Sequence, residues 1–361
     1  MRRRDFLGAL GAAALLPHPG DADSPPRAPK RLLVLGGTNF VGPAVVSEAM
    51  ARGHEVTLFN RGITRPHLFP ELEKLRGTRS ATGGGLGALE GARRWDAVID
   101  VWPEQRGLVE ETAALLRDRT DYYAYVSSIA VYSDFSGPGM DETARVRAGP
   151  PGEYGVEKAA AEAAVRAAYP GRHAIVRCPA IVGPYDPGSS YHFWLRRLAN
   201  RDEVLCPGSG LDPVQIVDVR DVARWTLDSV DASRPGTFNL TGPWPPRTMR
   251  DFLTETADAV GAAARLTWVD ADFLRRDQGV YSFSDMPLWA PLDEDEGFFQ
   301  ISGEAALEAG ASYRPVADTA RASWAWFRSH FFKDVVFPLH GSGIAAERED
   351  AILAAWREAR G

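Results

Sequence analysis

Two side chains able to exchange a proton with a substrate stand four residues apart in the stretch YGVEKAAAE, residues 154–162. If this alanine-rich stretch is a helix, Tyr154 and Lys158 share one face, because positions four apart stack along a helix. A phenol, whose reference pKa is about 10, needs a nearby positive charge to act as an acid or base near neutrality, and the Lys158 ammonium would supply it. The alternative is a tyrosine that simply opens a helix. The pair indicates a catalytic site only if the sequence also provides a cofactor-binding site and a third catalytic group.

The stretch YVSSIAVYSD, residues 125–134, supplies candidates for that third group. Its apolar first half is typical of a buried strand that ends at Ser127 and Ser128. Ligands of doubly wound sheets bind outside the carboxyl ends of the strands. A serine hydroxyl there would hydrogen-bond a substrate oxygen while Tyr154 exchanges the proton.

The stretch LGGTNFVG, residues 35–42, is the candidate cofactor site. It follows the apolar run RLLVL and opens a helix, and glycines at 36, 37 and 42 would let a pyrophosphate approach the helix N-terminus closely. The second strand, EVTLFN, ends at Asn60 and Arg61 without the acidic residue that binds the ribose of NAD. An arginine can hold a 2′-phosphate by forked hydrogen bonds, although a solvent-facing loop arginine is the alternative. We therefore expect NAD or NADP, with NADP slightly favoured.

Strands and helices alternate through the first half of the chain, which indicates βαβ units. Further apolar strands are expected at 96–101, 122–128 and 173–178, separated by helices at about 104–118 and 154–169. The predicted fold is α/β, a Rossmann doubly wound parallel sheet with a smaller C-terminal substrate-binding lobe. The expected division is an NAD(P)-binding domain at 31–180, a substrate lobe at 181–335 whose strands 214–219 and 236–242 return to the main sheet, and a C-terminal tail and helix at 336–361.

Composition and charge narrow the class of protein. The chain has 361 residues, 45% of them hydrophobic, which suits a globular protein with a sizeable core. A net charge of −7 disfavours nucleic acid as a partner. The two cysteines, Cys178 and Cys206, fall in strand-like segments and are expected to be buried free thiols rather than a disulfide. The seven scattered histidines form no metal-ligand pair, so no metal site is expected.

The N-terminus has a character of its own. It begins with three arginines after Met1 and continues into an apolar run from Phe6 to Leu16, which is too short to cross a bilayer. The order Arg3-Arg4-Asp5-Phe6-Leu7 resembles a twin-arginine export signal, and a frayed basic terminus is the alternative. We expect a signal peptide at 1–22, a proline-rich linker at 23–30, no membrane anchor in the mature chain, and a periplasmic or exported protein.

Six segments occur in the order found in one protein family: GGTNFVG, VSSIAVY, YGVEK, RCPAIVGPYDP, VQIVDVRDVA and FNLTGP. With them the chain resembles the extended short-chain dehydrogenases/reductases, which include the NAD-dependent epimerases and dehydratases. The resemblance implies Ser128, Tyr154 and Lys158 as catalytic residues, Pro179 and the residues after it beside the nicotinamide, and a homodimer built on the Tyr154 helix. The expected cofactor-binding residues are Gly36, Gly37, Thr38, Asn39, Phe40, Val41, Gly42, Asn60, Arg61, Asp100, Val101, Ser127, Tyr154, Lys158, Pro179, Ala180 and Ile181.

The sequence also departs from the family pattern. Asn39 replaces the middle glycine of the loop, as in atypical members of which some have lost catalysis and some bind RNA. The Asp-Glu pair that follows the serine in dehydratases is absent after Ser128, which disfavours water elimination.

The expected activity is hydride transfer at a secondary alcohol or ketone of a hydroxylated or sugar-like small molecule, by an oxidoreductase or an epimerase. Export favours an enzyme that keeps its cofactor. The alternative is a non-catalytic nucleotide- or RNA-binding protein that retains the fold. Candidate pocket walls, each also compatible with plain packing, are Trp102, Tyr132, Tyr185, His192, Trp194, Gln215 and Trp289.

Overall fold

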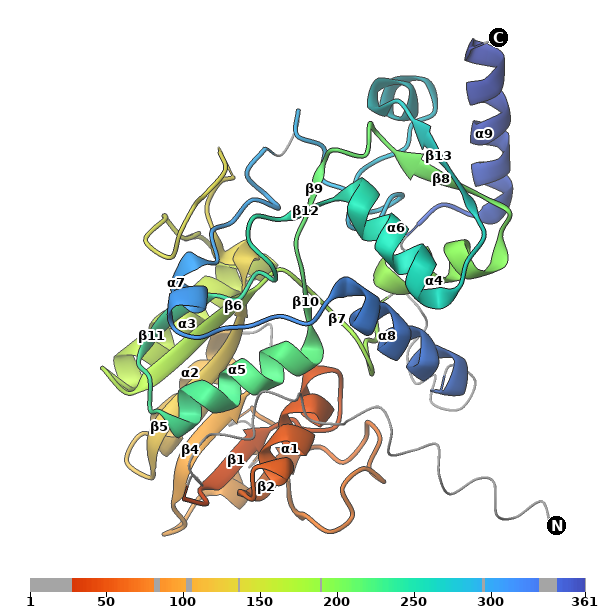
Figure 1. The fold of residues 1–361 in the computed structure, drawn as a ribbon. Coiled ribbons are helices and arrows are strands. Elements are labelled where there is room, and N and C mark those ends of the chain that lie inside the picture. The colour runs from red at the N-terminus through yellow and green to blue at the C-terminus, as the bar shows by residue number, and fades with distance from the viewer. Residues whose placement is uncertain are drawn as a thin grey trace, which may run out of the picture.

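A seven-stranded parallel sheet forms the centre of the molecule in a computed structural model that describes residues 28–80, 85–101, 106–135, 137–188, 190–293, 296–330 and 343–360. Its strand order is β11-β6-β5-β4-β1-β2-β3, and every pairing between neighbours is parallel (Figure 1). The strands are β1 (Arg31–Leu35), β2 (Glu55–Asn60), β3 (Glu73–Arg76), β4 (Trp95–Asp100), β5 (Thr120–Ser128), β6 (His173–Cys178) and β11 (Gly236–Asn239). The order runs outward in both directions from β1 and β4, which confirms the predicted doubly wound sheet.

Both faces of the sheet are covered by helices (Figure 1). The covering helices are α1 (Val41–Ala51), α2 (Arg106–Leu116), α3 (Tyr154–Ala168) and α5 (Val219–Asp231). Leu32 and Val34 pack in the cluster that contains α1 and α5, whereas Leu33 and Leu35 pack in the cluster of α2 and α3. Successive strand residues point to opposite faces, so a strand buried on both faces has to be apolar throughout, as RLLVL largely is.

A second lobe follows β6 and has its own core around Trp194, Phe252 and Trp289. Its helices α4, α6 and α9 and the pair β8–β13 lie together at one end of the molecule (Figure 1). The elements are β7 (Ala180–Val182), α4 (Ser190–Asn200), β8 (Glu203–Pro207), β9 (Pro213–Val214), β10 (Ile216–Asp218), β12 (Arg247–Thr248), α6 (Met249–Val260), β13 (Arg265–Val269), α8 (Val316–His330) and α9 (Ala346–Arg360). The short helix α7 (Glu304–Glu308) instead packs against the central sheet, where its Ala306 is buried.

The single strand expected at 214–219 is broken in the structure. Gln215 lies between β9 and β10, and its side-chain amide bonds the main chain of Ile301 twice, at 2.7 and 3.1 Å. Strand β10 pairs with β7, so the expectation that 214–219 returns to the main sheet is wrong. Among the described residues, the expected return is made by β11, which pairs with β6. The tertiary contact to Ile301 decides this break, which the apolar pattern of the segment does not reveal.

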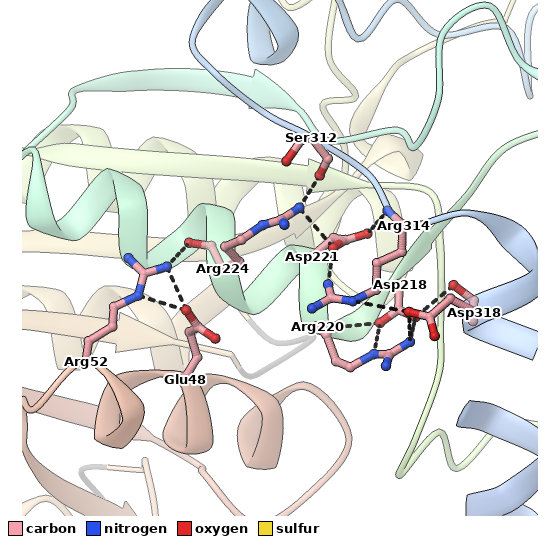
Figure 2. A network of polar contacts seen from close by, with 10 residues as sticks. Glu48, Arg52, Asp218, Arg220, Asp221, Arg224, Ser312, Arg314 and Asp318 are labelled. Carbon is pink, nitrogen blue, oxygen red and sulfur yellow. Dashed lines mark hydrogen bonds and ion pairs between the residues drawn. The ribbon is translucent and has the colours of Figure 1, made fainter. Parts of the chain in front are cut away.

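A network of ion pairs joins α5 to the segment that leads into α8 (Figure 2). The buried Asp221 of α5 accepts hydrogen bonds from Arg224 at 3.0 Å and from the main-chain N–H of Arg314 at 2.8 Å. Asp218 caps α5 through Arg220 N at 2.8 Å and also accepts from Thr319 of α8 at 2.8 Å. Buried charges of this kind need several donors each, and here the donors come from both lobes. The network therefore fixes the second lobe against the domain of the seven-stranded sheet.

The expected signal peptide, most of the expected linker, and Trp102 lie outside the described residues. Cys178 and Cys206 are free and buried, as predicted. Within the described ranges, no helix has the length and apolarity needed to cross a membrane. Over the same residues, no group of three or more His, Cys, Asp or Glu side chains could hold a metal ion.

Candidate active site

A cavity of about 530 Å³ lies at the carboxyl edge of the sheet, where β1 and β2 end. Such an edge is the usual ligand site of a doubly wound sheet, and the volume suits a small-molecule or cofactor pocket. The lining residues are Gly36, Gly37, Thr38, Asn39, Phe59, Asn60, Arg61, Gly62, Ile63, Thr64, Gly77, Thr78, Arg79, Ser80, Val101 and Leu108.

The glycine-rich loop between β1 and α1 has the geometry of a phosphate-binding turn. Gly36 and Gly37 adopt φ angles of 112° and 88°, which side chains with a Cβ rarely tolerate. A Cβ at Gly42 would lie 2.7 Å from the main chain of Gly37, so the first turn of α1 packs directly on the loop. Gly36, Gly37, Thr38 and Asn39 line the cavity, whereas the expected contacts Phe40, Val41 and Gly42 are not among its lining residues, and Gly42 N donates to Asn39 O at 2.9 Å. A glycine-rich loop that leads from a strand to a helix N-terminus in this way fits the pyrophosphate of a dinucleotide.

The ends of β2 and of the neighbouring β3 carry one arginine each, Arg61 and Arg76, and no carboxylate. Asn60 donates to Gly36 O at 2.8 Å and accepts from Gly62 N at 2.9 Å, which holds the turn after the strand. Arg76, at the end of the neighbouring β3, donates to the same Asn60 side chain. Arg61 is exposed and borders the cavity. This end of the pocket is therefore positively charged.

Asp100 does not present its carboxylate to the cavity. It is fully buried, and Arg79 donates to both of its oxygens, at 2.6 and 2.7 Å, while Tyr123 OH donates at 2.7 Å. Burial opposes the charge of Arg79, yet the neighbouring Asp100 raises its pKa above the ordinary value. Asp100 can reach a cofactor only through its main chain, whereas Val101, the next residue, lines the cavity.

The three residues expected to be catalytic lie at the end of β5 and on the helix that packs against it. Lys158 is buried on α3 and its Nζ donates to the main-chain oxygen of Val126 at 3.1 Å, two residues before Ser128. Tyr154 is the first residue of α3, one turn from Lys158, and its side chain is 44% exposed. Ser128 Oγ accepts from Ala130 N at 3.1 Å, which leaves the hydroxyl hydrogen available to a substrate. Helix α3 thus presents its Tyr–Lys face to the strand end that carries the serine.

The remaining expected contacts occupy neighbouring strand ends. Pro179 follows β6, and Ala180 and Ile181 begin β7, both partly exposed. Ser127 is turned away from the site, because its hydroxyl donates to Glu162 at 2.7 Å inside the protein. Burial raises the pKa of Cys178 to about 12, against the influence of Lys158, so this thiol stays protonated near neutrality.

Most of the candidate pocket walls belong to the core. Trp194 donates to Pro287 O at 2.7 Å and Trp289 to Asp212 at 2.9 Å, both fully buried. Tyr132 is also fully buried and donates to Asn239 at 2.6 Å. Tyr185 is partly exposed and lies under the guanidinium of Arg65, 5.4 Å from the ring centre. His192 is buried against Trp326 and Phe327 of α8.

Three residues near the site, Arg76, Arg79 and Glu162, belong to none of the sequence motifs described above. Arg76 ends a short edge strand, EKLR, whose charged residues hide its strand character. Arg79 follows in the next loop, and its partner Asp100 is 21 residues away. Glu162 stands four residues after Lys158 on the same helix face, so an extension of the Tyr–Lys spacing by one turn would have found it.

Comparison with known proteins agrees with this geometry. The model of the NAD dependent epimerase/dehydratase family matches residues 104–241, a segment that includes β5 and α3. The 2'-dehydrokanamycin reductase of Streptomyces kanamyceticus is 34% identical over 143 residues. That match covers 38% of this chain and 38% of the relative, so the likeness to the reductase is confined to little more than a third of either protein.

Solved structures share the whole architecture at lower identity. The Bordetella bronchiseptica enzyme WbmH in complex with NAD+ superimposes with a TM-score of 0.64 at 15% identity, over 84% of this chain and 99% of that one. The Thermus thermophilus UDP-glucose 4-epimerase, a complex with NAD, gives 0.60 at 20% identity, over 83% and 99%. The Thermotoga maritima UDP-glucose 4-epimerase with UDP-glucose gives 0.61 at 17% identity, over 83% and 99%. The chain therefore has the Rossmann-like fold of these epimerases.

Proposed function

We propose that the protein is an NAD(P)-dependent enzyme that transfers hydride at a secondary alcohol or ketone of a hydroxylated, sugar-like small molecule. The proposal is carried by one contact, the hydrogen bond from Lys158 to the main chain of Val126 at 3.1 Å. This contact sets the Tyr154–Lys158 face of α3 against the strand end that carries Ser128. The dinucleotide-type cavity at the same edge of the sheet supports the proposal, as does the family match over this segment.

In this mechanism the nicotinamide, when bound, accepts or returns the hydride. Ser128 donates its hydroxyl hydrogen to the reacting substrate oxygen, since its own Oγ already accepts from Ala130 N. Tyr154 removes the hydroxyl proton as an alcohol is oxidised, and returns a proton to the carbonyl oxygen as a ketone is reduced. The Lys158 ammonium stabilises the tyrosinate by its charge. The Lys158 ammonium donates a hydrogen bond to Val126 O, which keeps its positive charge one helical turn from Tyr154.

The direct test is Tyr154→Phe, assayed with NADH and NADPH against keto sugars and keto glycosides. We expect turnover to fall by about 10²- to 10⁴-fold, the usual worth of a positioned acid–base group, while nucleotide affinity stays unchanged. Tyr281→Phe is a matched control, because Tyr281 is 64% exposed in a distant loop. Unchanged turnover in Tyr154→Phe would reject the mechanism and favour a non-catalytic nucleotide-binding protein.

We propose NADP as the preferred cofactor, with Arg61 reading the 2′-phosphate and Arg76 beside it. Guanidinium groups bind phosphate through charge-assisted, often bidentate hydrogen bonds. Among the contacts described above, no carboxylate neutralises the charge of Arg61 or of Arg76. Arg61→Ala should raise the dissociation constant of NADPH at least tenfold and that of NADH less than threefold, as roughly one charge-assisted contact is lost. Arg31→Ala, at the opposite end of β1, is the control. An equal loss for both nucleotides would contradict the assignment.

The same residues would serve two kinds of enzyme. One is a reductase whose cofactor dissociates after each turnover, and the other is an epimerase that keeps its cofactor and returns the hydride to the molecule from which it was taken. The curated relative is named a reductase, and the solved neighbours include epimerases. Denaturing the purified protein and weighing the released nucleotide by mass spectrometry separates the two. Near-stoichiometric nucleotide favours the epimerase cycle, whereas an empty protein that binds added NADPH favours a reductase.

We also propose export by the twin-arginine route, on the strength of the N-terminal sequence. Replacement of Arg3 and Arg4 by lysine should retain the protein in the cytoplasm, and fractionation of cells checks this. Unchanged export would reject the signal.

A further inference from the structure

Helix α3 buries a glutamate on the face that carries the catalytic pair. Glu162 is fully buried and lies four residues after Lys158 and eight after Tyr154, so the three side chains follow one another along the helix. A carboxylate is removed from water only at a high cost unless it is fully hydrogen-bonded. The proposed reaction does not use Glu162, so the reason for burying its carboxylate has to lie in the groups that hydrogen-bond it.

Four hydrogen bonds saturate the Glu162 carboxylate. Oε1 accepts from Ser127 Oγ at 2.7 Å and from Arg177 Nε at 3.0 Å. Oε2 accepts from Arg177 Nη2 at 2.8 Å and from Arg166 Nη2 at 3.0 Å. Arg177 is itself buried, and although burial opposes its charge, the hydrogen bonds and charge of Glu162 raise its pKa above the ordinary value. The pair is thus a fork-to-carboxylate contact, with the geometric specificity that such contacts have.

The donors come from the two strand ends that the active site uses. Ser127 directly precedes Ser128 at the end of β5, and Arg177 precedes Cys178 and Pro179 at the end of β6. Ser127 and Arg177 are register partners across the two strands. One carboxylate on α3 therefore holds both strand ends at once, and any rotation or sliding of α3 would break at least one short contact.

The same network continues into the loop over the site and the second lobe. The Arg177 guanidinium lies 4.9 Å from the ring centre of Tyr132, whose hydroxyl donates to Asn239 at 2.6 Å. Asn239 in turn donates to Ser302 O at 3.1 Å. Tyr132, Asn239 and Ser302 are thereby linked to the same buried polar cluster.

Stability alone does not account for such a cluster. A buried ion pair contributes little net stability, because the desolvation of two charges offsets their attraction. What the pair supplies is a fixed geometry, because the three hydrogen bonds from Ser127 and Arg177 form together in only one position of the helix relative to the strands. The separation of Tyr154 from Ser128 depends on that position, and a misplacement of about 1 Å can cost about 10²-fold in rate.

We propose that Glu162 is a positioning residue, which clamps Ser127 and Arg177 and so sets the placement of the Tyr154–Lys158 face relative to Ser128. This inference rests on the proposed function for its kinetic meaning, but its structural content is independent of any activity. Glu162 touches neither substrate nor cofactor in this role, and acts through the helix and the strands.

Two variants test the clamp, and one serves as the matched control. Glu162→Gln keeps the shape but turns an amide donor toward the Arg177 guanidinium. Ser127→Ala removes only the contact to β5 and leaves the ion pair intact, so it remains informative if Glu162→Gln does not fold. Arg166→Leu is the control, because Arg166 donates to the same carboxylate from the same helix, and its other hydrogen bond goes to Thr237 of β11, at 3.0 Å, and not to the strand ends of β5 or β6.

The kinetic readout is kcat against the dissociation constant of the nucleotide, measured well below each melting temperature. We expect kcat to fall at least tenfold in Glu162→Gln and in Ser127→Ala, with nucleotide affinity changed less than about threefold, and Arg166→Leu to stay within about twofold of the wild type. A kcat near that of the wild type in both clamp variants would overturn the proposal, even if both melt at lower temperature.

The structural readout is the distance from Ser128 Oγ to Tyr154 OH in crystals of the same variants. The proposal requires this distance to change in Glu162→Gln and Ser127→Ala and to stay constant in Arg166→Leu. A constant distance in all three rejects the clamp. If the wild type shows no turnover with any substrate, the proposed function has failed, and the crystals still decide on the clamp.

Discussion

Gly155 lies so close to the main-chain oxygen of Ala130 that no side chain fits at position 155. A Cβ at position 155 would lie 2.1 Å from that oxygen. Ala130 belongs to the short 3-10 turn Ile129–Val131 that directly follows Ser128. The first turn of α3, which carries Tyr154, therefore rests directly on the turn after the candidate substrate-binding serine.

Gly155→Ala should impair catalysis more than binding. The added methyl group has to push α3 away from the turn, which moves Tyr154 relative to Ser128, and a shift of about 1 Å can cost about 10²-fold in rate. We expect kcat to fall by roughly 10- to 100-fold with nucleotide affinity nearly unchanged. Gly107→Ala in α2 is the control, because a Cβ there meets nothing within 4 Å. Equal kcat values for the two variants would contradict the role of the close approach.

Gly42→Ala should impair nucleotide binding. A Cβ there would lie 2.7 Å from the Gly37 main chain, and two backbones cannot yield as a flexible side chain can. The loop has to move off the helix N-terminus, and we expect the dissociation constant of the dinucleotide to rise at least tenfold, or about 1.4 kcal/mol. Titration of intrinsic fluorescence with NADH and NADPH measures this. Gly87→Ala, where a Cβ meets nothing within 4 Å, should bind like the wild type.

Arg79→Met should destabilise the fold strongly. It leaves the buried Asp100 carboxylate with Tyr123 as a donor but without its cation, and removal of one partner of a buried pair costs about 3–5 kcal/mol. Chemical denaturation followed by circular dichroism measures the free energy of unfolding. The double variant Arg79→Met/Asp100→Asn removes the unpaired charge and should recover most of the loss. A double variant no more stable than the single one would show that packing, not charge, explains the effect.

Asp186 should make stability depend on pH. Burial raises the pKa of this carboxyl to about 7, partly opposed by the hydrogen bond from Gly188 N–H, whereas an unfolded chain releases the proton at about 4. Between these values the folded state binds a proton that the unfolded state has lost. The free energy of unfolding therefore falls as the pH rises from about 4 to about 7, and levels off above that range.

Asp186→Asn removes this dependence. We expect it to raise the free energy of unfolding at pH 8 by roughly 2–4 kcal/mol and to have little effect below pH 4, measured by denaturation across the pH range. The exposed Asp277, changed to Asn, provides the comparison. A constant difference between Asp186→Asn and the wild type at all pH values would mean that the carboxyl does not titrate in this way.

Much of the architecture follows from local patterns in the sequence. An apolar strand followed by glycines and a helix is readable as a phosphate-binding turn, because φ angles, helix N-termini and strand alternation depend on neighbouring residues. The Tyr154–Lys158 spacing likewise needs only the helical repeat. These features, together with the doubly wound sheet, were predicted without any knowledge of the tertiary structure.

The tertiary structure decided which polar side chains are committed to internal partners. Asp100 and Ser127 stand at strand ends where a ligand is expected, yet Arg79 and Glu162 take up their hydrogen bonds inside the protein. The partners lie 21 and 35 residues away in the chain. Such pairings depend on how strands and helices pack, and burial makes them nearly obligatory, since an unpaired charge in the core costs several kcal/mol. The sequence thus determined where the candidate site lies, and the packing decided which of its polar groups are bound to internal partners.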